Sequence, residues 1–433
     1  MRRSGTRSRV PGGLARLAWP FLAVPLVFAA GPGPFTHGCA TGDVTDRAAI
    51  AWTRLDRPAE VAFEVATEAD FRDARRLAVG SAAARSDFIV KAETAGLEPD
   101  TAYRVRPVMR EAGGGEVAGP PCRLRTAPDP ARRAPVRFAW GADMREAYRP
   151  FRIFDRMREK GPAFFLLLGD SIYADYHDSV GVANTLYGYR RKYQINREDS
   201  AFQHFLAEVP VVVIWDDHEI ANDFDRMHPL LPMGRQVLFE YWPIRADGED
   251  AMRLYRAFRW GRDIEVFVLD TRQYRSPKGD PNGPGKTLLG AAQKAWLMRA
   301  LKASPAAFKF VASSVPLRYA SWDSWEGYVT ERQEILRFLE REAIRGVVFL
   351  TGDTHRVAAV RHPEGVWEFM ATPLAAQLPG TDRAAGRAGV RFSLTGRLNY
   401  GLVAVAGDGE PPSARIEIYD DANTLLHAER ITP

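Results

Sequence analysis

The chain has 433 residues, of which 46% are hydrophobic and 26% are charged. This ordinary globular composition excludes a disordered or low-complexity protein, and the length favours two or more domains. The formal net charge of +5 equals the five arginines of the first sixteen residues, which include no acidic residue. The remaining chain is neutral, so its charge predicts no specific nucleic-acid partner.

The N-terminus has the pattern of an export signal. Its arginines precede a short apolar run at 17–30, which ends in small residues. The run is shorter than the ~20 apolar residues of a transmembrane helix, and it contains Pro20 and Pro25. We therefore expect residues 1–30 to direct export to the periplasm, the cell surface or the medium. The sequence does not decide between the Sec and twin-arginine routes.

Residues 35–128 carry the pattern of a small β-sandwich. Short segments rich in β-forming residues lie at 48–53 and 61–65, separated by turn residues. Residues 97–103, with the sequence LEPDTAY, resemble the corner of fibronectin type III domains, where a tyrosine hydrogen-bonds back across a turn. The Pro-rich, charged segment at 127–133 then predicts a linker.

Residues 136–433 have a mixed pattern. Strand-like apolar runs recur, and helical spacing of apolar residues appears between several of them, as at 151–160 and 293–303. This alternation predicts an α/β sheet domain, and the chain ends in further β-rich segments at 401–405 and 414–419. The strands are expected at 136–140, 163–168, 209–214, 264–269, 308–312 and 346–350.

Only two cysteines are present, Cys39 and Cys122. Two thiolates are too few for a four-cysteine zinc site. In an exported protein they can form one disulfide, and the alternative is two independent buried thiols.

Polar side chains that suit metal binding follow four of the predicted strands. Ligands of open α/β sheets bind beyond the carboxyl ends of the strands, so these side chains should converge. The candidate metal ligands are Asp143, Asp170, Tyr173, Asp217, Asp353 and His355. Two metal ions ~3.5–4 Å apart can neutralise phosphoryl oxygens and activate water, and Asp170 suits the bridging position between them.

Other residues near these ligands have several interpretations. Asp216 or Asn222 can share or replace the role of Asp217. His218 is a candidate catalytic residue at the phosphoryl group or the leaving oxygen, and Arg145 is a candidate phosphate-binding residue. Arg272 can either clamp substrate or form an internal salt bridge with Asp270.

The motifs resemble those of the metallophosphoesterase superfamily, and their departures match its PhoD branch. The four segments are DMR at 143–145, GDSIY at 169–173, WDDHE at 215–219 and GDTH at 352–355. Two further segments with PhoD-like sequence are PFTHGCATGD at 34–43 and LDTRQYR at 269–275. The resemblance covers nearly the whole chain from residue 34.

This resemblance implies a four-layered α/β/β/α metallophosphatase domain behind the fibronectin-like β-sandwich. It also implies two or more metal ions, Ca²⁺ together with Fe³⁺, and Tyr173 suits Fe³⁺ as a tyrosinate ligand. The family often has a cysteine ligand after the first strand, but here Asp143 takes its place. Oxygen in place of sulfur hardens the site, so Mn²⁺, Mg²⁺ or Ca²⁺ also become candidates.

The sequence thus predicts an exported, metal-dependent phosphoester hydrolase, an alkaline phosphatase or phosphodiesterase, acting as a monomer on a small-molecule or polymer phosphoester. A membrane or cell-wall substrate stays open. One alternative is a phospholipase D-like diesterase with Trp322 and Trp325 facing lipid. The other is a non-catalytic, metal-stabilised binding protein at the cell surface.

Overall fold

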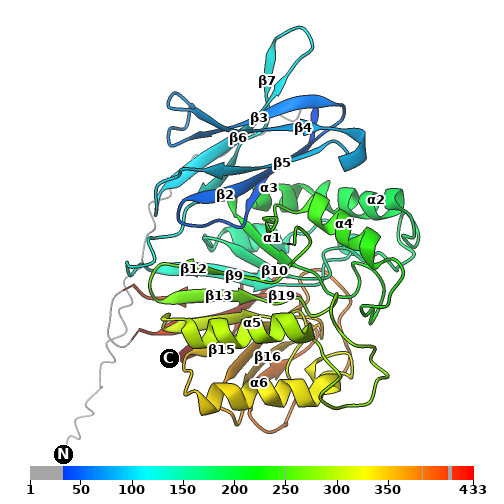
Figure 1. Cartoon of the computed structure of the whole chain (residues 1–433), viewed down its shortest axis with the longest axis vertical. Helices are drawn as coiled ribbons and strands as arrows, with labels where there is room; N and C mark the ends of the chain where they lie inside the picture. Colours follow the sequence, from blue (N-terminus) through cyan, green and yellow to red (C-terminus); the bar gives the residue numbers. More distant parts are fainter. Residues whose placement is uncertain (1–32, 249, 383, 408–411) are drawn as a thin grey trace, which may run out of the picture. The chain divides into compact units, whose positions relative to one another are not determined.

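Two large β-sheets lie face to face at the centre of the molecule, with helices on their outer sides (Figure 1). This computed structural model describes residues 33–433 except 249, 383 and 408–411. The predicted export signal therefore lies outside the described residues. In these described ranges, no helix has the length and apolar character needed to cross a bilayer.

The first large sheet joins both ends of the described chain. Its strand order is β21-β20-β19-β9-β10-β11-β1-β2-β5, and β9, β10 and β11 run parallel to one another. The strands are β1 (Phe35–Gly42), β2 (Ala48–Leu55), β5 (Ile89–Ala95), β9 (Val136–Gly141), β10 (Phe165–Leu168), β11 (Val211–Ile214), β19 (Asn399–Val405), β20 (Ala414–Asp420) and β21 (Leu425–Ile431).

The second large sheet has the order β12-β13-β14-β15-β17-β16-β18, and β13, β14, β15 and β17 run parallel. The strands are β12 (Arg256–Trp260), β13 (Ile264–Val268), β14 (Phe308–Ala312), β15 (Val347–Thr351), β16 (Val357–Arg361), β17 (Trp367–Ala371) and β18 (Val390–Leu394).

Aromatic side chains fill the space between the two sheets. The ring of Phe138 on β9 meets Phe310 on β14 edge-on, with 5.2 Å between centroids. Phe164 stacks on Phe138 and contacts Trp260 on β12. The parallel strands that meet here are almost entirely apolar, as expected for strands buried on both faces.

Helices cover the outer face of each sheet, giving the α/β/β/α layering. On the first sheet, Phe154 of α1 and Phe205 of α3 pack on Phe165 of β10. On the second, α5 and α6 supply Leu297 and Leu336 to a core that also contains β-strand residues. The helices are α1 (Ile153–Arg158), α2 (Leu186–Arg197), α3 (Ser200–Glu208), α4 (Leu231–Tyr241), α5 (Gly290–Ala303) and α6 (Val329–Arg341).

The N-terminal segment adds a smaller sheet that packs as a β-sandwich, as the sequence predicts. Its order is β4-β3-β6-β7, with β8 also paired to β6. The Tyr103 hydroxyl accepts a hydrogen bond from the Glu98 N–H at 2.9 Å, which is the predicted corner. The strands are β3 (Ala59–Ala66), β4 (Arg75–Ala82), β6 (Ala102–Arg110), β7 (Glu116–Ala118) and β8 (Cys122–Arg125).

Hydrogen bonds join the β-sandwich to the rest of the molecule, and a disulfide links two strands within the sandwich. Strand β1 pairs with β11, at Gly42 and Val211, so one sandwich sheet continues into the first large sheet. Cys39 and Cys122 form a disulfide between β1 and β8. The residues from 33 onward that the structure describes belong to one compact unit. The division into domains at 35–128 and 136–433 stays a prediction.

Candidate metal centre

The loops after β9 and β10 are held together by their backbones. The Asp143 N–H donates to the Gly169 carbonyl at 3.2 Å, and the Met144 N–H donates to the Asp170 carbonyl at 2.9 Å. Gly169 is required here, because a Cβ would lie 2.4 Å from the Asp216 nitrogen in the loop after β11. These contacts place the carboxyl ends of three neighbouring strands around one point.

Four of the predicted ligands have left-handed backbone conformations. The φ angles are +67° at Asp143, +50° at Asp170, +69° at Asp353 and +51° at His355. Aspartate and histidine visit this region more readily than most residues, but each such position still costs free energy. Residues held in this way cluster at functional sites, where the surrounding structure fixes the direction of a side chain.

The predicted ligands lie in two overlapping clusters. One ligand atom each from Asp143, Asp170 and His355 lie within 4.8 Å of one another. The same holds for Asp170, Asp217 and His218. Asp170 belongs to both groups, as a carboxylate that bridges two cations must.

A third cluster brings Asp353 to the same region. Its carboxylate lies within 4.8 Å of those of Asp216 and Asp217. All six predicted ligands thus come from adjoining loops, since the sixth, Tyr173, has its hydroxyl 3.3 Å from His355 Nε2. Asn222, the alternative ligand, donates its backbone N–H to Asp175 at 2.8 Å, and its role as a ligand stays a prediction.

The charges of this region fit bound cations. Burial and the charges of Asp217 and Asp143 raise the pKa of Asp170 well above its usual range. Burial and the charges of Asp216 and Asp217 do the same to the pKa of Asp353. Buried oxygens of Asp143, Asp216 and Asp217 also lack a hydrogen-bond partner. Cations would offset the repulsion and coordinate these oxygens.

Tyr173 is buried against the same carboxylates. Burial and the charge of Asp170 raise the pKa of its phenol well above the usual value. Its ring stacks on His218, with centroids 4.3 Å apart. The phenol therefore stays protonated in the metal-free protein, and a strongly polarising cation would be needed to ionise it.

His218 is oriented by a carboxylate that the sequence analysis did not single out. Its Nδ1 lies 2.9 Å from Asp175 Oδ1, and its backbone N–H donates to Asp170. Burial lowers the pKa of His218, but the charge of Asp217 and the hydrogen bond to Asp175 outweigh burial and raise it to about 9. In the metal-free protein the imidazole is therefore protonated near neutral pH, with Nδ1–H donating to Asp175.

Glu219 braces two of the loops. It accepts hydrogen bonds from the backbone N–H groups of Asp170, Ser171 and Asp216, and from the Ser171 hydroxyl. One buried carboxylate thus fixes the backbones of the loops after β10 and β11. Its position at the end of the WDDHE block is the sequence signal that marks it.

Arg272 forms an internal salt bridge, but not the one expected with Asp270. Its fully buried guanidinium contacts Asp216 at 2.6 Å and Asp323 at 2.7 Å. The Asp270 carboxylate instead accepts from the Arg272 backbone N–H and the Trp215 indole N–H. Asp323, which no sequence motif marks, is a further buried carboxylate beside the centre.

Arg145 lies in the loop after β9 with its guanidinium already engaged. It makes a bidentate ion pair with Asp178 at 2.6–3.1 Å and stacks over the Tyr176 ring at 4.3 Å. The Tyr176 ring also meets His218 edge-on. The arginine is therefore held near the centre by a carboxylate, and its role in phosphate binding stays a prediction.

The architecture and the clustered carboxylate and imidazole groups define the protein as a metallophosphatase by fold. The family model described as "PhoD-like phosphatase" matches residues 138–400. A second, "PhoD-like phosphatase, N-terminal domain", matches residues 23–128. The chain belongs to the PhoD-like phosphatase family, and the predicted fold class and family resemblance are confirmed.

Known proteins resemble the chain in sequence and in structure. It is 28% identical over 383 residues to alkaline phosphatase D of Bacillus subtilis (strain 168), covering 74% of this chain but only 64% of that protein. The structure of PhoD matches with a TM-score of 0.79 at 23% identity, covering 92% of each chain. The purple acid phosphatase from yellow lupin (Lupinus luteus) seeds matches with a TM-score of 0.65 at 11% identity, covering 91% of this chain and 73% of that one.

Proposed function

We propose that this protein is an exported metal-dependent phosphoester hydrolase of the alkaline phosphatase and phosphodiesterase type. The observation that carries the proposal is the place of Asp170 in both carboxylate and imidazole clusters. Asp143, Tyr173 and His355 would hold one cation, Asp217 and Asp353 the other, and Asp170 both. Bound cations would neutralise phosphoryl oxygens and supply activated water.

His218 would act on the reacting phosphoester itself. Oriented by Asp175, and protonated in the metal-free protein, it can donate a hydrogen bond or a proton to an oxygen that gains charge. Arg145, held by Asp178, would contribute positive charge at the rim of the centre.

The donor set supports several cations. Carboxylate oxygens suit Ca²⁺, Mg²⁺ or Mn²⁺, and the phenol of Tyr173 suits Fe³⁺. With Asp143 in the place of a family cysteine, we infer an oxygen-rich centre for Ca²⁺, with Fe³⁺ or Mn²⁺ as its partner.

The substrate would be a phosphomonoester or phosphodiester met outside the cytoplasm by a monomer. The lipid-directed alternative has less support, because only Trp322 of the two tryptophans is exposed. Trp325 is 1% exposed and donates its indole N–H to Ser313.

The test is hydrolysis of p-nitrophenyl phosphate and bis(p-nitrophenyl) phosphate at mildly alkaline pH, before chelation, after chelation, and after readdition of Ca²⁺, Mn²⁺ or Fe³⁺. We expect chelation to abolish turnover and at least one cation to restore it. Absence of turnover with every cation, in protein shown to be folded, would contradict the proposal and favour the binding-protein alternative.

A further inference from the structure

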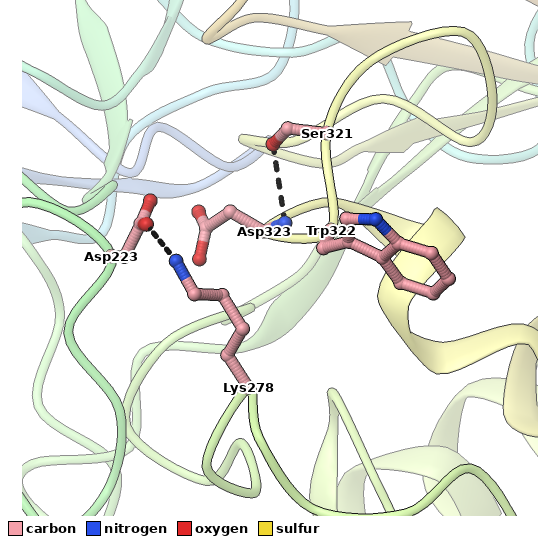
Figure 2. A pocket seen from close by; sticks show the side chains of 5 residues that line it. All are labelled: Asp223, Lys278, Ser321, Trp322 and Asp323. Atoms are coloured by element: carbon pink, nitrogen blue, oxygen red, sulfur yellow. Dashed lines mark hydrogen bonds and ion pairs between the residues drawn. The ribbon is translucent and has the colours of Figure 1, made fainter.

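A pocket of about 460 Å³ opens beside the metal centre (Figure 2). No step of the proposed mechanism uses it. Its lining combines an indole, an amine, a hydroxyl and two carboxylates. The lining residues are Asp223, Lys278, Ser321, Trp322 and Asp323.

The pocket adjoins the metal centre, because two of its carboxylates lie close to Asp217. Ligand oxygens of Asp217, Asp223 and Asp323 lie within 4.8 Å of one another. The Asp223 backbone N–H also donates to Asp217 Oδ2 at 2.7 Å. A phosphoryl group at the centre would therefore have one ester substituent within reach of the pocket.

Trp322 is exposed although its loop is firmly held. The indole residue is 71% exposed, and Figure 2 shows its ring turned away from Asp323. The Ser324 hydroxyl donates to the Ser321 carbonyl at 2.7 Å, and the Asp323 N–H donates to the Ser321 hydroxyl at 3.1 Å. Gly327 permits this turn, since a Cβ there would lie 2.0 Å from the Trp322 carbonyl oxygen.

An exposed aromatic ring on a braced loop suits recognition. Arg275 adds to the bracing by donating to the Asp323 carbonyl at 2.6 Å. Because the loop is already ordered, a ligand ring that stacks on Trp322 would cost little loop entropy. Flat rings stack on an indole face with useful free energy.

The charges around the pocket select against an additional anion. Asp323 is offset by Arg272 and Arg275, and Asp223 is offset by Lys278, with which it forms an ion pair. The pocket therefore has no surplus positive charge for a second phosphate. An uncharged substituent with a flat face meets the indole without this penalty.

Most of the pocket comes from the loops after β13 and β14, and only Asp223 shares the loop after β11 with His218. His218 contacts Tyr173, Asp175 and Tyr176, all from the loop after β10. If His218 acts on the leaving oxygen, the leaving alcohol lies on that side. The pocket is then placed for the alcohol that stays attached to phosphorus.

We propose that this pocket is a specificity subsite for the retained alcohol of a phosphodiester, with Trp322 as the platform for a flat ring. The inference rests on the proposed function. It assigns the centre a preference for diesters with a ring-bearing retained alcohol over monoesters, which have no retained alcohol.

Lys278 has a different part in the same subsite. It keeps the Asp223 carboxylate neutralised beside Asp217, so its loss would leave an unpaired negative charge near the incoming phosphoester. A monoester dianion would be repelled more strongly than a diester monoanion. Lys278 thus lowers KM generally, whereas Trp322 acts only through the ring.

The kinetic test compares bis(p-nitrophenyl) phosphate with methyl p-nitrophenyl phosphate in the metal-loaded full chain. In Trp322→Ala, we expect the ratio of the KM for methyl p-nitrophenyl phosphate to the KM for bis(p-nitrophenyl) phosphate to fall about fivefold, with kcat unchanged. Trp322→Phe should restore most of it. In Lys278→Met, we expect KM to rise about threefold for p-nitrophenyl phosphate, and less for the diesters.

Matched variants test whether the effects belong to the pocket. Tyr187→Ala removes an aromatic ring that is 76% exposed elsewhere. Lys302→Met breaks the exposed ion pair with Glu342. Both variants should keep the wild-type ratio between the KM values of the one-ring and the two-ring diester. The subsite would be contradicted if Trp322→Ala left that ratio unchanged, or raised KM for the monoester as much as for the two-ring diester.

A binding measurement separates failure of the subsite from failure of the proposed function. Calorimetry with diphenyl phosphate and dimethyl phosphate requires no turnover. We expect diphenyl phosphate to bind wild type more tightly, and Trp322→Ala to remove most of that difference. An equal difference in both proteins would overturn the subsite, whereas absent hydrolysis with intact ring-dependent binding would overturn only the proposed hydrolase.

Discussion

His218 and Asp175 illustrate how single residues set the chemistry of the centre. Asp175 binds His218 Nδ1 at 2.9 Å and also accepts the Asn222 N–H at 2.8 Å, so one carboxylate fixes both the ring and the loop after β11. The pKa of His218, raised to about 9, depends on this contact and on Asp217. Removing the charge of Asp175 should therefore lower it.

We expect Asp175→Asn to lower the pKa of His218 by about one pH unit in the chelated protein, measured by NMR titration of the ring. Because the pKa is raised in the folded state, protonated His218 contributes full stability below pH 6.5, and this is lost as pH rises toward about 9. Asp178 lies three positions further in the same loop and pairs with Arg145. Asp178→Asn is therefore the control and should leave the pKa of His218 unchanged. An unchanged pKa in Asp175→Asn would contradict the assigned role.

The sequence predicted the convergence of the candidate ligands better than the residues that position them. Asp170 and His355 follow apolar strands within recognisable motifs, so their convergence could be expected from strand order. Asp323 comes from a loop without any motif, and Arg272 was paired with the wrong aspartate. Contacts of this kind depend on which loops the two sheets bring together, and local sequence carries little information about that.

Strand β1 connects the β-sandwich with the first large sheet. The sequence placed it within a separate sandwich, yet it also pairs with β11 of the first large sheet. Pairing between strands about 170 positions apart leaves no periodic signal in either segment. Strand β11 was predictable, because it is an apolar run, whereas β1 has the mixed sequence FTHGCATG and was marked only by its PhoD-like motif.

A buried histidine on β1 gives this element a pH dependence. His37 is 6% exposed, and burial together with the charges of Arg54 and Arg197 lowers its pKa to about 3. The unfolded chain therefore binds a proton before the folded one. The stability that His37 contributes is complete above pH 6.5 and is lost as pH falls from 6.5 toward 3.

We expect the chelated wild-type protein to lose about 1.6 kcal/mol of unfolding free energy between pH 6.5 and pH 5 through His37. His37→Gln should lack this component, so its loss over the same interval should be smaller by that amount in denaturant titrations. NMR titration of the wild-type ring gives a second readout. Protonation of His37 above pH 6 in the folded state would refute the assignment.

At the scale of the whole molecule, two sheets and their loops converge on one charged centre. The first sheet supplies Asp143, Asp170 and Asp217, and the second supplies Asp353 and His355 after β15. Each sheet thus contributes part of the proposed ligand set. The layering predicted from the resemblance is therefore also what assembles the proposed site.

The most direct measurement of the central claim is the metal content of wild type and Asp170→Asn, with turnover recorded on the same samples. We expect at least two equivalents of metal in wild type. In the variant we expect loss of at least one equivalent and at least ~10³-fold lower kcat, because both cations share Asp170. Asp263→Asn, at a buried aspartate directly before β13, serves as the matched control. Full metal content and full turnover in Asp170→Asn would contradict the bridged centre.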